Sequence, residues 1–425
     1  MNPMKKFTSL ILALSLLLGV TMLTSCNLMS LIMEGADGFT EPNKPETPDD
    51  DDGETNIYVE GGDTNNITIT PSDSNVAVAA SKAILSVVSI YAEFERTYTS
   101  GWRTYTEPFA QSGSGVIYKL DKNSGDAYVI TNYHVIHSSK DNSATKIARK
   151  LSLFLYGMES EDYAISAEFV GGSMQYDLAV LKITASPILI SSLATAATIG
   201  DSNDVAVLDT AIAIGNPDAS GISATVGYVN VDSEEISLLA SDDKTLMNLR
   251  VMRIDAAING GNSGGGAFNA EGELIGIVNA KKTSSDGMGY AIPSNVAKYI
   301  ADNVIANCNG TTKTSVERCI VGITVTAGEL YTSYDEESGR VHRCERVKVA
   351  ELVKDSKAED LFKIDDVIES ITIDGKTYEV TRTFHVVDAM LNARVGSKVS
   401  FNIIRDGSKT TLDVTVTADM LVEYK

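Results

Sequence analysis

The sequence predicts a mostly β protein, in which a barrel or sandwich of many short strands is followed by a small separate domain. Between about residues 80 and 293, short apolar runs such as SVVSIYAEF and DLAVLKI alternate with polar turns that contain glycine, a spacing typical of all-β sandwiches and barrels. From 320 to 420 the pattern changes to hairpins with Asp-Gly turns around one amphipathic stretch, TFHVVDAMLNARV, which predicts one helix. This change of pattern predicts a second domain.

Length and charge set limits on the function. The chain has 425 residues, enough for two or three domains with their own cores. Its formal net charge of −22 repels nucleic acid and anionic surfaces, so we expect no nucleic-acid partner. The cysteines lack the spacing of zinc ligands and the paired histidines that often complete such sites, and we expect no metal and no cofactor.

The N-terminus predicts export from the cytoplasm. Lys5 and Lys6 precede an apolar run from Phe7 to Leu23, and the sequence LTSC then ends at Cys26. This segment resembles the lipobox of bacterial lipoproteins, and the resemblance implies cleavage before Cys26, lipid attachment to it and a place in the bacterial envelope. An uncleaved membrane anchor is the alternative, because the apolar run is slightly longer than is usual in a signal peptide.

A segment that cannot form a core follows. It includes EPNKPETPDDDDGETN, which has three prolines, four consecutive aspartates and almost no apolar side chains. Such a composition buries too little surface to offset the chain entropy lost on folding. We therefore assign residues 1–26 to a lipoprotein signal peptide and 27–75 to a disordered acidic tether that holds the body off the membrane.

The other cysteines leave their pairing open. With Cys26 modified by lipid, Cys308, Cys319 and Cys344 remain, an odd number for a compartment that can be oxidising. A disulfide between Cys308 and Cys319 is conceivable, since they bracket the polar stretch NGTTKTSVER. Buried free thiols are the alternative.

One helical pattern marks the end of the first domain. The stretch PSNVAKYIADNVIANC has helical periodicity, with Ser294 as its expected N-cap. Residues 308–319 follow it and are the expected joint between the two domains.

Three residues carry the chemistry of the chain. His134 lies in VITNYHVI at the end of an apolar strand, Asp177 in YDLAVLKI where a strand begins, and Ser263 in the glycine-rich stretch INGGNSGGGAF. Taken singly, a histidine at a strand end is usually structural, and an aspartate there usually faces solvent. Together, in this order in a β-rich chain, they provide the nucleophile, the base and the orienting acid that nucleophilic hydrolysis requires.

The glycines around Ser263 fit the same chemistry. They permit a sharp turn and leave room for substrate. Hydrolysis also requires backbone N–H groups aimed at the developing oxyanion, each worth about 2.7–4 kcal/mol. We expect this oxyanion hole to use the N–H groups of Gly261 and Ser263.

These motifs resemble the chymotrypsin-type serine proteases, and among them the HtrA (Deg) family of envelope proteases. Besides the three motifs, AIAIGNP, SATVGYV, GELIGIV and GYAIPS stand in the family's order. The resemblance implies a chymotrypsin-like double β-barrel over residues 76–307 with the site in the cleft between the barrels. It also implies that His134 is the general base, Asp177 its orienting acid and Ser263 the nucleophile.

The family resemblance extends to substrates and assembly. It implies degradation of unfolded or misfolded proteins, and a homo-oligomer, typically a trimer. Aligned on the serine, the base of the S1 pocket falls at Ala257 and Ile258. No carboxylate is expected there to meet Lys or Arg, although Asp255 lies nearby in the sequence, so small apolar P1 residues are predicted.

Residues 320–421 resemble a PDZ domain, which this family places after its protease. The resemblance implies that CIVGITV, with Val321, Gly322 and Ile323, forms the carboxylate-binding loop and its strand. The helix over 384–395 would line the groove. A PDZ domain binds peptide C-termini by adding a strand to a sheet edge. The segment LFKIDD departs from the family pattern, which has a Gly-containing turn there.

Other interpretations compete with this one. GNSGG also matches the nucleophile elbow of α/β-hydrolases, which requires alternating strands and helices and a histidine after the serine; only His342 and His385 qualify, and both lie in the small domain. A catalytically silent scaffold that binds through its PDZ domain is a second alternative, and its signature would be a missing triad residue. His137 competes with His134 as the base, but it is displaced from the strand end.

Overall fold

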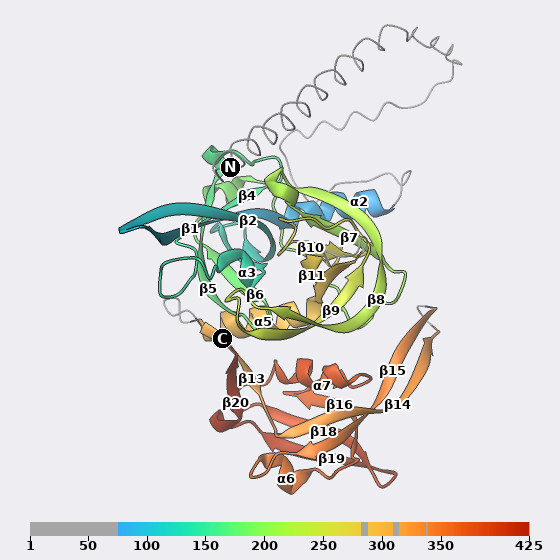
Figure 1. The fold of residues 1–425 in the computed structure, drawn as a ribbon. Helices are drawn as coiled ribbons and strands as arrows, with labels where there is room; N and C mark the ends of the chain where they lie inside the picture. The colour runs from blue at the N-terminus through green and yellow to red at the C-terminus, as the bar shows by residue number, and fades with distance from the viewer. Residues whose placement is uncertain (1–74, 282–287, 309–313, 337–338, 425) are drawn as a thin grey trace, which may run out of the picture. The chain divides into compact units, whose positions relative to one another are not determined.

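The computed structural model describes residues 75–281, 288–308, 314–336 and 339–424 (Figure 1). Contacts divide the chain into the units Met1–Ile69 and Thr70–Lys425, and every described residue belongs to the second. The predicted signal peptide, Cys26 and all but the last residue of the predicted tether lie outside the described residues. Within the described part of the chain, no helix is both long enough and apolar enough to cross a membrane.

The first barrel is a ring of six antiparallel strands. They run in the order β5-β4-β1-β2-β3-β6, and the pairing of β5 with β6 closes the ring. Alternate side chains point inward, and Ile90, Ile117 and Leu153 are completely buried there. The strands are β1 (Val87–Ser100), β2 (Arg103–Asp121), β3 (Asp126–Thr131), β4 (Lys150–Leu155), β5 (Ile165–Ser173) and β6 (Leu178–Ile183).

The second barrel is closed in the order β10-β11-β12-β9-β8-β7. Its strands are β7 (Thr210–Gly215), β8 (Ser223–Leu239), β9 (Leu246–Ile254), β10 (Gly266–Phe268), β11 (Leu274–Lys281) and β12 (Gly289–Pro293). One buried cluster joins the two barrels, with Val116 and Ile130 from the first and Ile212 and Phe268 from the second. Side chains that lie between the barrels therefore rest on a continuous core.

A third sheet lies C-terminal to the barrels. Its order is β14-β15-β16-β18-β19, with β17 paired to β16. The strands are β14 (Ile323–Asp335), β15 (Arg340–Leu352), β16 (Val367–Ile373), β17 (Lys376–Glu379), β18 (Lys398–Arg405) and β19 (Ser408–Thr415). Both predicted Asp-Gly turns have two successive residues at positive φ, Asp374-Gly375 and Asp406-Gly407, as a type I′ turn requires. The predicted mostly β architecture, two barrels followed by a small β domain, is confirmed.

The helices are short and connect or cover the strands. They are α2 (Asn75–Ala83), α3 (Tyr133–Ile136), α4 (Pro187–Ser191), α5 (Ser294–Asn307), α6 (Lys357–Leu361) and α7 (Thr383–Met390), with 3-10 turns η1 (Ile84–Ser86), η2 (Glu161–Tyr163), η3 (Pro217–Ala219) and η4 (Ala418–Met420). The predicted N-cap of α5 is wrong by one position. Pro293 is the N-cap, and the Ser294 hydroxyl instead donates to the Gly200 carbonyl at 2.7 Å. The helix predicted over 384–395 ends early, at Met390, because tighter bonds such as Asn392 N–H to Ala389 O replace the α-helical pattern.

The expected joint at 308–319 contains a strand. β13 (Thr314–Cys319) pairs in parallel with β5 of the first barrel and antiparallel with the last strand, β20 (Leu421–Tyr424). The two ends of the C-terminal region therefore extend the first barrel's sheet to eight strands. Sequence patterns predicted the joint but not this pairing, which unites segments far apart in the chain.

The conceivable disulfide between Cys308 and Cys319 does not form, and Cys308, Cys319 and Cys344 are all free thiols. Cys319 is buried in the core of the C-terminal sheet, whereas Cys308 packs against the core that joins the barrels. Burial raises the pKa of the Cys319 thiol to about 11. The buried-thiol alternative is therefore the one that the structure favours.

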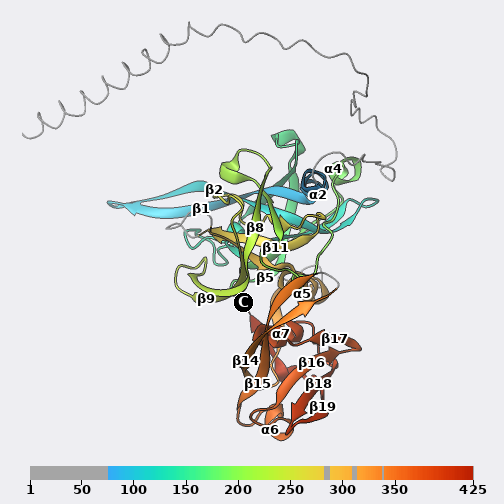
Figure 2. The same ribbon diagram turned by 90° about the vertical axis from the view of Figure 1, so that its right-hand side faces the viewer.

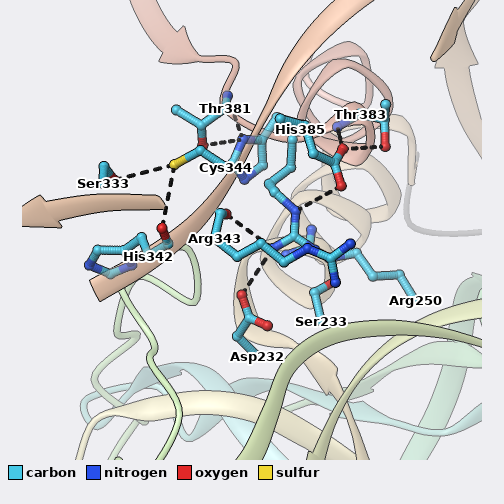
Figure 3. A network of polar contacts seen from close by, with 12 residues as sticks. Asp232, Ser233, Arg250, Ser333, His342, Arg343, Cys344, Thr381, Thr383 and His385 are labelled. Atoms are coloured by element: carbon cyan, nitrogen blue, oxygen red, sulfur yellow. Dashed lines mark hydrogen bonds and ion pairs between the residues drawn. The ribbon is translucent and has the colours of Figure 1, made fainter. Parts of the chain in front are cut away.

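A polar network links strand β8 to the C-terminal domain (Figure 3), and an ion pair links strand β9 to helix α7. The Arg382 guanidinium donates to Asp232 at 3.0 Å and to Glu345 at 3.3 Å, and Arg250 forms an ion pair with Asp388. Arg382 and Glu345 are buried, so each of these charges needs its partner. His385 stays neutral beside them: burial and the Arg250 and Arg382 charges lower its pKa to about 3.

Candidate active site

The loop between β9 and β10 carries Ser263 in a conformation that requires glycine. Gly261 has a φ of +95° and Gly264 a φ of +85°. A Cβ atom at Gly261 would lie 2.2 Å from the Asn216 carbonyl oxygen, and one at Gly264 would lie 2.2 Å from the Ser114 carbonyl oxygen. The sequence is bare of side chains here because the backbone both turns sharply and packs against two other backbone segments.

Ser114 of β2 anchors this loop to the first barrel. Its backbone N–H donates to the Ser263 carbonyl at 2.8 Å, and its hydroxyl donates to the Gly261 carbonyl at 2.7 Å. The same hydroxyl accepts from the Asn216 N–H at 2.8 Å. One serine thus positions both residues that were expected to supply the oxyanion hole, and the sequence analysis did not single it out.

His134 and Asp177 come together between the barrels. His134 lies on α3, directly after β3, and Asp177 sits at a positive φ of 48° just before β6. The two side chains meet at 2.6 Å between His134 Nδ1 and Asp177 Oδ2, and the His134 backbone N–H donates to Asp177 Oδ1 at 2.9 Å. Asp177 is 2% exposed, so its carboxylate is held by these bonds and not by water.

The electrostatics of the pair favour a charged imidazole. Burial of the ring opposes protonation of His134, but the charge and the hydrogen bond of Asp177 outweigh it and raise the pKa of His134 above its ordinary value of 6.5. The ring remains reachable, since 37% of the side chain is exposed. This histidine can therefore accept a proton from a neighbouring group and hold the resulting charge beside Asp177.

Asn279 of β11 is a site residue that the sequence analysis missed. Its side-chain Nδ2 donates to Asp177 Oδ2 at 2.6 Å, the oxygen that also meets His134. Its backbone carbonyl accepts the Ser263 hydroxyl at 2.8 Å, so in this structure Ser263 donates to Asn279 and not to His134. The sequence offered one clue to this residue, because Asn279 is a lone amide at the end of the apolar run LIGIV. Its side chain is 2% exposed, and a buried polar side chain requires a hydrogen-bond partner.

Two family models match parts of the chain. Residues 113–277 match the family model of the trypsin-like peptidase domain, and residues 321–416 match that of the PDZ domain. "Serine protease Do-like HtrA" of Bacillus subtilis (strain 168) is 31% identical over 350 residues, which span 80% of this chain and 71% of that relative. The chain belongs to the HtrA family. It is a serine protease of the trypsin-like type with a C-terminal PDZ domain.

Further relatives of this HtrA protease have similar identity. "Serine protease Do-like HtrA" of Lactococcus lactis subsp. lactis (strain IL1403) is 32% identical over 72% of this chain and 70% of its own length. "Probable periplasmic serine endoprotease DegP-like" of Chlamydia trachomatis serovar D is 31% identical over 69% of this chain and 52% of its own length. Among solved structures, "HtrA-type protease AlgW with decapeptide" is 27% identical, with a TM-score of 0.49, over 80% of this chain and 98% of that one.

The competing histidines of this HtrA protease lie in other environments. His137 is buried, and its ring packs against Tyr133. Burial lowers the pKa of His137, against the opposing charge of Asp242. His342 lies in strand β15 and His385 in helix α7, both in the C-terminal domain. Only His134 is paired with Asp177 in the described residues, and the double barrel is not the alternating fold that an α/β-hydrolase requires.

The segment before the serine loop has one large apolar side chain and one acidic side chain. Ile258 is 8% exposed and lies close to Gly289, where an added Cβ would meet its Cδ1 atom at 2.4 Å. Ala257 is exposed, and its carbonyl accepts the Thr225 hydroxyl at 2.9 Å. Asp255 Oδ1 accepts the Tyr228 backbone N–H at 2.6 Å. The one carboxylate of this segment is therefore bonded to β8.

The predicted peptide-binding loop of the PDZ domain leads into an edge strand. Val321 is buried, Gly322 has a φ of +99°, and Ile323 begins β14. A Cβ atom at Gly322 would lie 2.3 Å from the Ser356 hydroxyl oxygen. β14 is the last strand in the order of its sheet, so its outer edge has no neighbour in that sheet.

Proposed function

We propose that His134, Asp177 and Ser263 hydrolyse peptide bonds through an acyl-enzyme. The Ser263 hydroxyl turns from the Asn279 carbonyl toward His134 and attacks the substrate carbonyl while His134 Nε2 takes its proton. Asp177 holds the other ring nitrogen, Nδ1, in the protonated tautomer. The N–H groups of Gly261 and Ser263 stabilise the oxyanion, and His134 then gives its proton to the leaving amine, which departs as the acyl-enzyme forms. Water then attacks the acyl-enzyme while His134 takes its proton, and that proton returns to the Ser263 oxygen as the product acid leaves. The 2.6 Å contact between His134 and Asp177 is the observation that carries this proposal.

Substitution of the three residues tests the proposal. Ser263→Ala should lower kcat by about 10⁶-fold with the fold intact, and His134→Ala by a similar factor, since the two act as a unit. Asp177→Asn should lower kcat by about 10⁴-fold. The measurement is cleavage of an unfolded model protein, with circular dichroism to check folding. Full activity of Ser263→Ala would end the proposal.

We infer that the S1 pocket, with Ala257 and Ile258 at its base, accepts small apolar residues such as Val, Ala or Ile. The bond between Asp255 Oδ1 and the Tyr228 N–H supports this inference, because it directs the acidic side chain of this segment toward β8. Mass-spectrometric mapping of the cleavage products tests it. Predominant cleavage after Lys or Arg would contradict it.

We propose that the PDZ domain binds the free C-termini of peptides at Val321, Gly322 and Ile323. The peptide would add a strand to the open edge of β14, and the loop N–H groups would bind its carboxylate. Titration with a peptide that ends in apolar residues, and with the same peptide amidated at its C-terminus, tests this. Equal binding of both forms would exclude carboxylate recognition.

We also propose that the protease is held at the extracytoplasmic face of the bacterial membrane by lipid on Cys26. The LTSC motif supports the anchor, and the periplasmic relative supports the compartment. The proposed organisation is a signal peptide (1–26), a tether (27–75), a protease domain (76–307) and a PDZ domain (320–421). Incorporation of labelled palmitate into the wild-type chain, and its loss in Cys26→Ser, tests the lipid attachment. Failure of the wild-type chain to take up label would favour an uncleaved membrane anchor.

From the family we infer the biological role. Unfolded or misfolded envelope proteins are the proposed substrates, and a homotrimer is the proposed assembly. Light scattering coupled to size-exclusion chromatography measures the mass of the assembly. A monomer that degrades unfolded protein at full rate would contradict the trimer and leave the proposed chemistry intact.

A further inference from the structure

The hairpin of β1 and β2 extends well beyond the first barrel (Figures 1 and 2). The two strands stay paired in register from Val87–Val116 out to Ser100–Arg103. β4 accompanies β1 only as far as Glu93, so the outer part of the hairpin has only its own two strands. Its loop consists of Gly101, at a φ of +65°, and Trp102, which is the glycine-first pattern of a type II′ turn.

One face of this hairpin is an aromatic ladder. Phe94 and Phe109 stack at 5.2 Å where the hairpin leaves the barrel, and Tyr98 and Tyr105 stack at 5.5 Å nearer the tip. All four lie on one face, because side chains alternate along a strand and the pairs are separated by an even number of residues. Exposure rises outward: Phe94 is 1% exposed, the two tyrosines are over 40% exposed and Trp102 is 95% exposed.

The hairpin is built as an ordered element. Thr97 and Thr106, directly opposite one another, share a hydrogen bond of 3.1 Å between their hydroxyls. Arg96 and Glu107 form an ion pair between the two aromatic steps. Such cross-strand pairs stabilise a two-stranded ribbon, so the aromatic tip is presented in a fixed conformation at low entropic cost.

The tip also differs in charge from the rest of the protein. The chain carries a net charge of −22, yet residues 97–106, TYTSGWRTYT, contain no acid and one base, Arg103. An acidic protein is repelled by an anionic surface, and an acid-free projection is the part that can approach one. Proteins place aromatic side chains with a polar edge in the interfacial zone of a bilayer. The tip has this kind of composition, with tyrosine, tryptophan and threonine and a single arginine.

We propose that this aromatic tip, residues 98–105, binds the interfacial zone of a lipid bilayer. This inference rests on the proposal above that the N-terminal segment holds the chain at a membrane, by lipid on Cys26 or as an uncleaved anchor, and β1 begins at Val87, after the proposed tether 27–75. A convex projection fits a lipid surface, whereas a peptide partner would call for a groove. The unpaired outer edges of the two strands keep the tip at headgroup depth, because backbone N–H and C=O groups cannot be buried in hydrocarbon without partners.

The protein carries its own reporter for the test, because Trp102 is its only tryptophan. The full chain is reconstituted with vesicles of phosphatidylcholine and phosphatidylglycerol, and tryptophan emission is recorded. The expected result is a blue shift, protection from the aqueous quencher acrylamide, and quenching by phosphatidylcholine brominated at shallow acyl positions. The apolar N-terminal segment contains no tryptophan and so does not contribute to the signal.

Variants that keep Trp102 show whether the aromatic face is responsible. Tyr98→Ser with Tyr105→Ser should lose most of the blue shift and of the bromolipid quenching. Tyr156→Ser with Tyr163→Ser is the matched control, since both are exposed tyrosines outside the hairpin, and it should behave as wild type. Circular dichroism checks that each variant folds.

If the aromatic tip binds a partner other than lipid, the experiment gives a distinct result, and each such result would overturn the proposal. Binding to a second copy of the chain would protect Trp102 in detergent without vesicles, in proportion to protein concentration. Binding to substrate would shift the emission on addition of unfolded protein and not of lipid. A Trp102 that is equally open to acrylamide with and without vesicles would show that the tip does not meet the bilayer. None of these outcomes bears on the Ser263 chemistry, which is assayed separately.

Discussion

His134 is subject to two opposing influences that set the pH dependence of the protease. Burial of the ring favours the neutral form, and the adjacent Asp177 carboxylate favours the charged form and prevails, so the pKa of His134 is raised. A general base must be neutral before the reaction. The active form is therefore the one present above the raised pKa.

We thus expect kcat/KM to rise with pH and its midpoint to lie above 6.5, the ordinary histidine value. The measurement is kcat/KM for a peptide substrate across the neutral range. The residual activity of Asp177→Asn should have a lower midpoint, since the charge that stabilises the imidazolium is gone. A wild-type midpoint below 6.5 would contradict this account of the pair.

Asn279 is expected to act as a positioning residue, through Asp177. Asn279→Ala removes a hydrogen bond to a buried carboxylate, worth about 1.5–3 kcal/mol, and should lower kcat by about 10- to 100-fold. It should also raise the pH midpoint, because an Asp177 with one donor fewer attracts the His134 proton more strongly. Asn303→Ala is the control: Asn303 is completely buried in α5, outside the site, and its loss should lower stability without moving the midpoint. An unchanged midpoint in Asn279→Ala would reduce the role of Asn279 to packing.

At the scale of elements, the serine loop is held by close backbone contact. Gly264→Ala places a methyl group 2.2 Å from the Ser114 carbonyl oxygen at a φ of +85°. We expect it to lower the free energy of unfolding by more than the roughly 1–2 kcal/mol that a left-handed conformation costs an alanine, and to abolish activity. Gly407→Ala separates the cost of the left-handed backbone from the cost of the close contact, since Gly407 has a φ of +76° with nothing within 4 Å. Urea denaturation of both variants gives the comparison, and equal losses would show that the close contact contributes nothing.

At the scale of the whole molecule, the ion pair of Arg250 with Asp388 joins β9 to α7. Both side chains are largely buried, at 14% and 13% exposure. Arg250→Ala leaves a buried carboxylate without a cation and should cost about 3–5 kcal/mol of stability. The double variant Arg250→Ala with Asp388→Ala should lose less than the sum of the single variants.

The pH dependence of the Arg250→Ala defect gives a second check. Burial raises the pKa of Asp388, and the Arg250 charge opposes that effect. Without Arg250 the carboxyl takes up a proton more readily in the folded state than in the unfolded state, so the stability deficit should shrink as pH falls. Lys409→Ala is the control, because its pair with Glu369 is exposed and contributes little. Additive losses for Arg250 and Asp388 would show that the pair does not couple the two regions.

Much of the fold and of the site was predictable from short windows of sequence. Alternating apolar runs predicted the strands, and the Asp-Gly pairs predicted the two hairpin turns of the C-terminal sheet. The structure shows a contact between His134 and Asp177, whose motifs the sequence singled out, whereas the catalytic roles of these residues and of Ser263 stay predictions. The glycines beside Ser263 predicted a tight turn, and positive φ angles at Gly261 and Gly264 agree with it.

Other features depend on which distant segments meet. The donor to Asp177 was missed because Asn279 lies 102 residues away in sequence and reaches it only after both barrels close. The N-cap expected at Ser294 failed because the Gly200 carbonyl, 94 residues distant, takes its hydroxyl. Cys308 and Cys319 are near in sequence but pack into different cores. The disulfide that their spacing made conceivable therefore does not form.

The sequence by itself therefore determined the β architecture, the order of the motifs and the chemical types available to the site. Only the tertiary structure decided that Ser114 anchors the serine loop, that Asp255 is bonded to β8, and that β20 pairs with β13 beside the first barrel. The physical reason is range. Periodicity, turn conformation and side-chain chemistry act over a few residues, whereas a buried hydrogen bond depends on which atoms the packed core brings within about 3 Å.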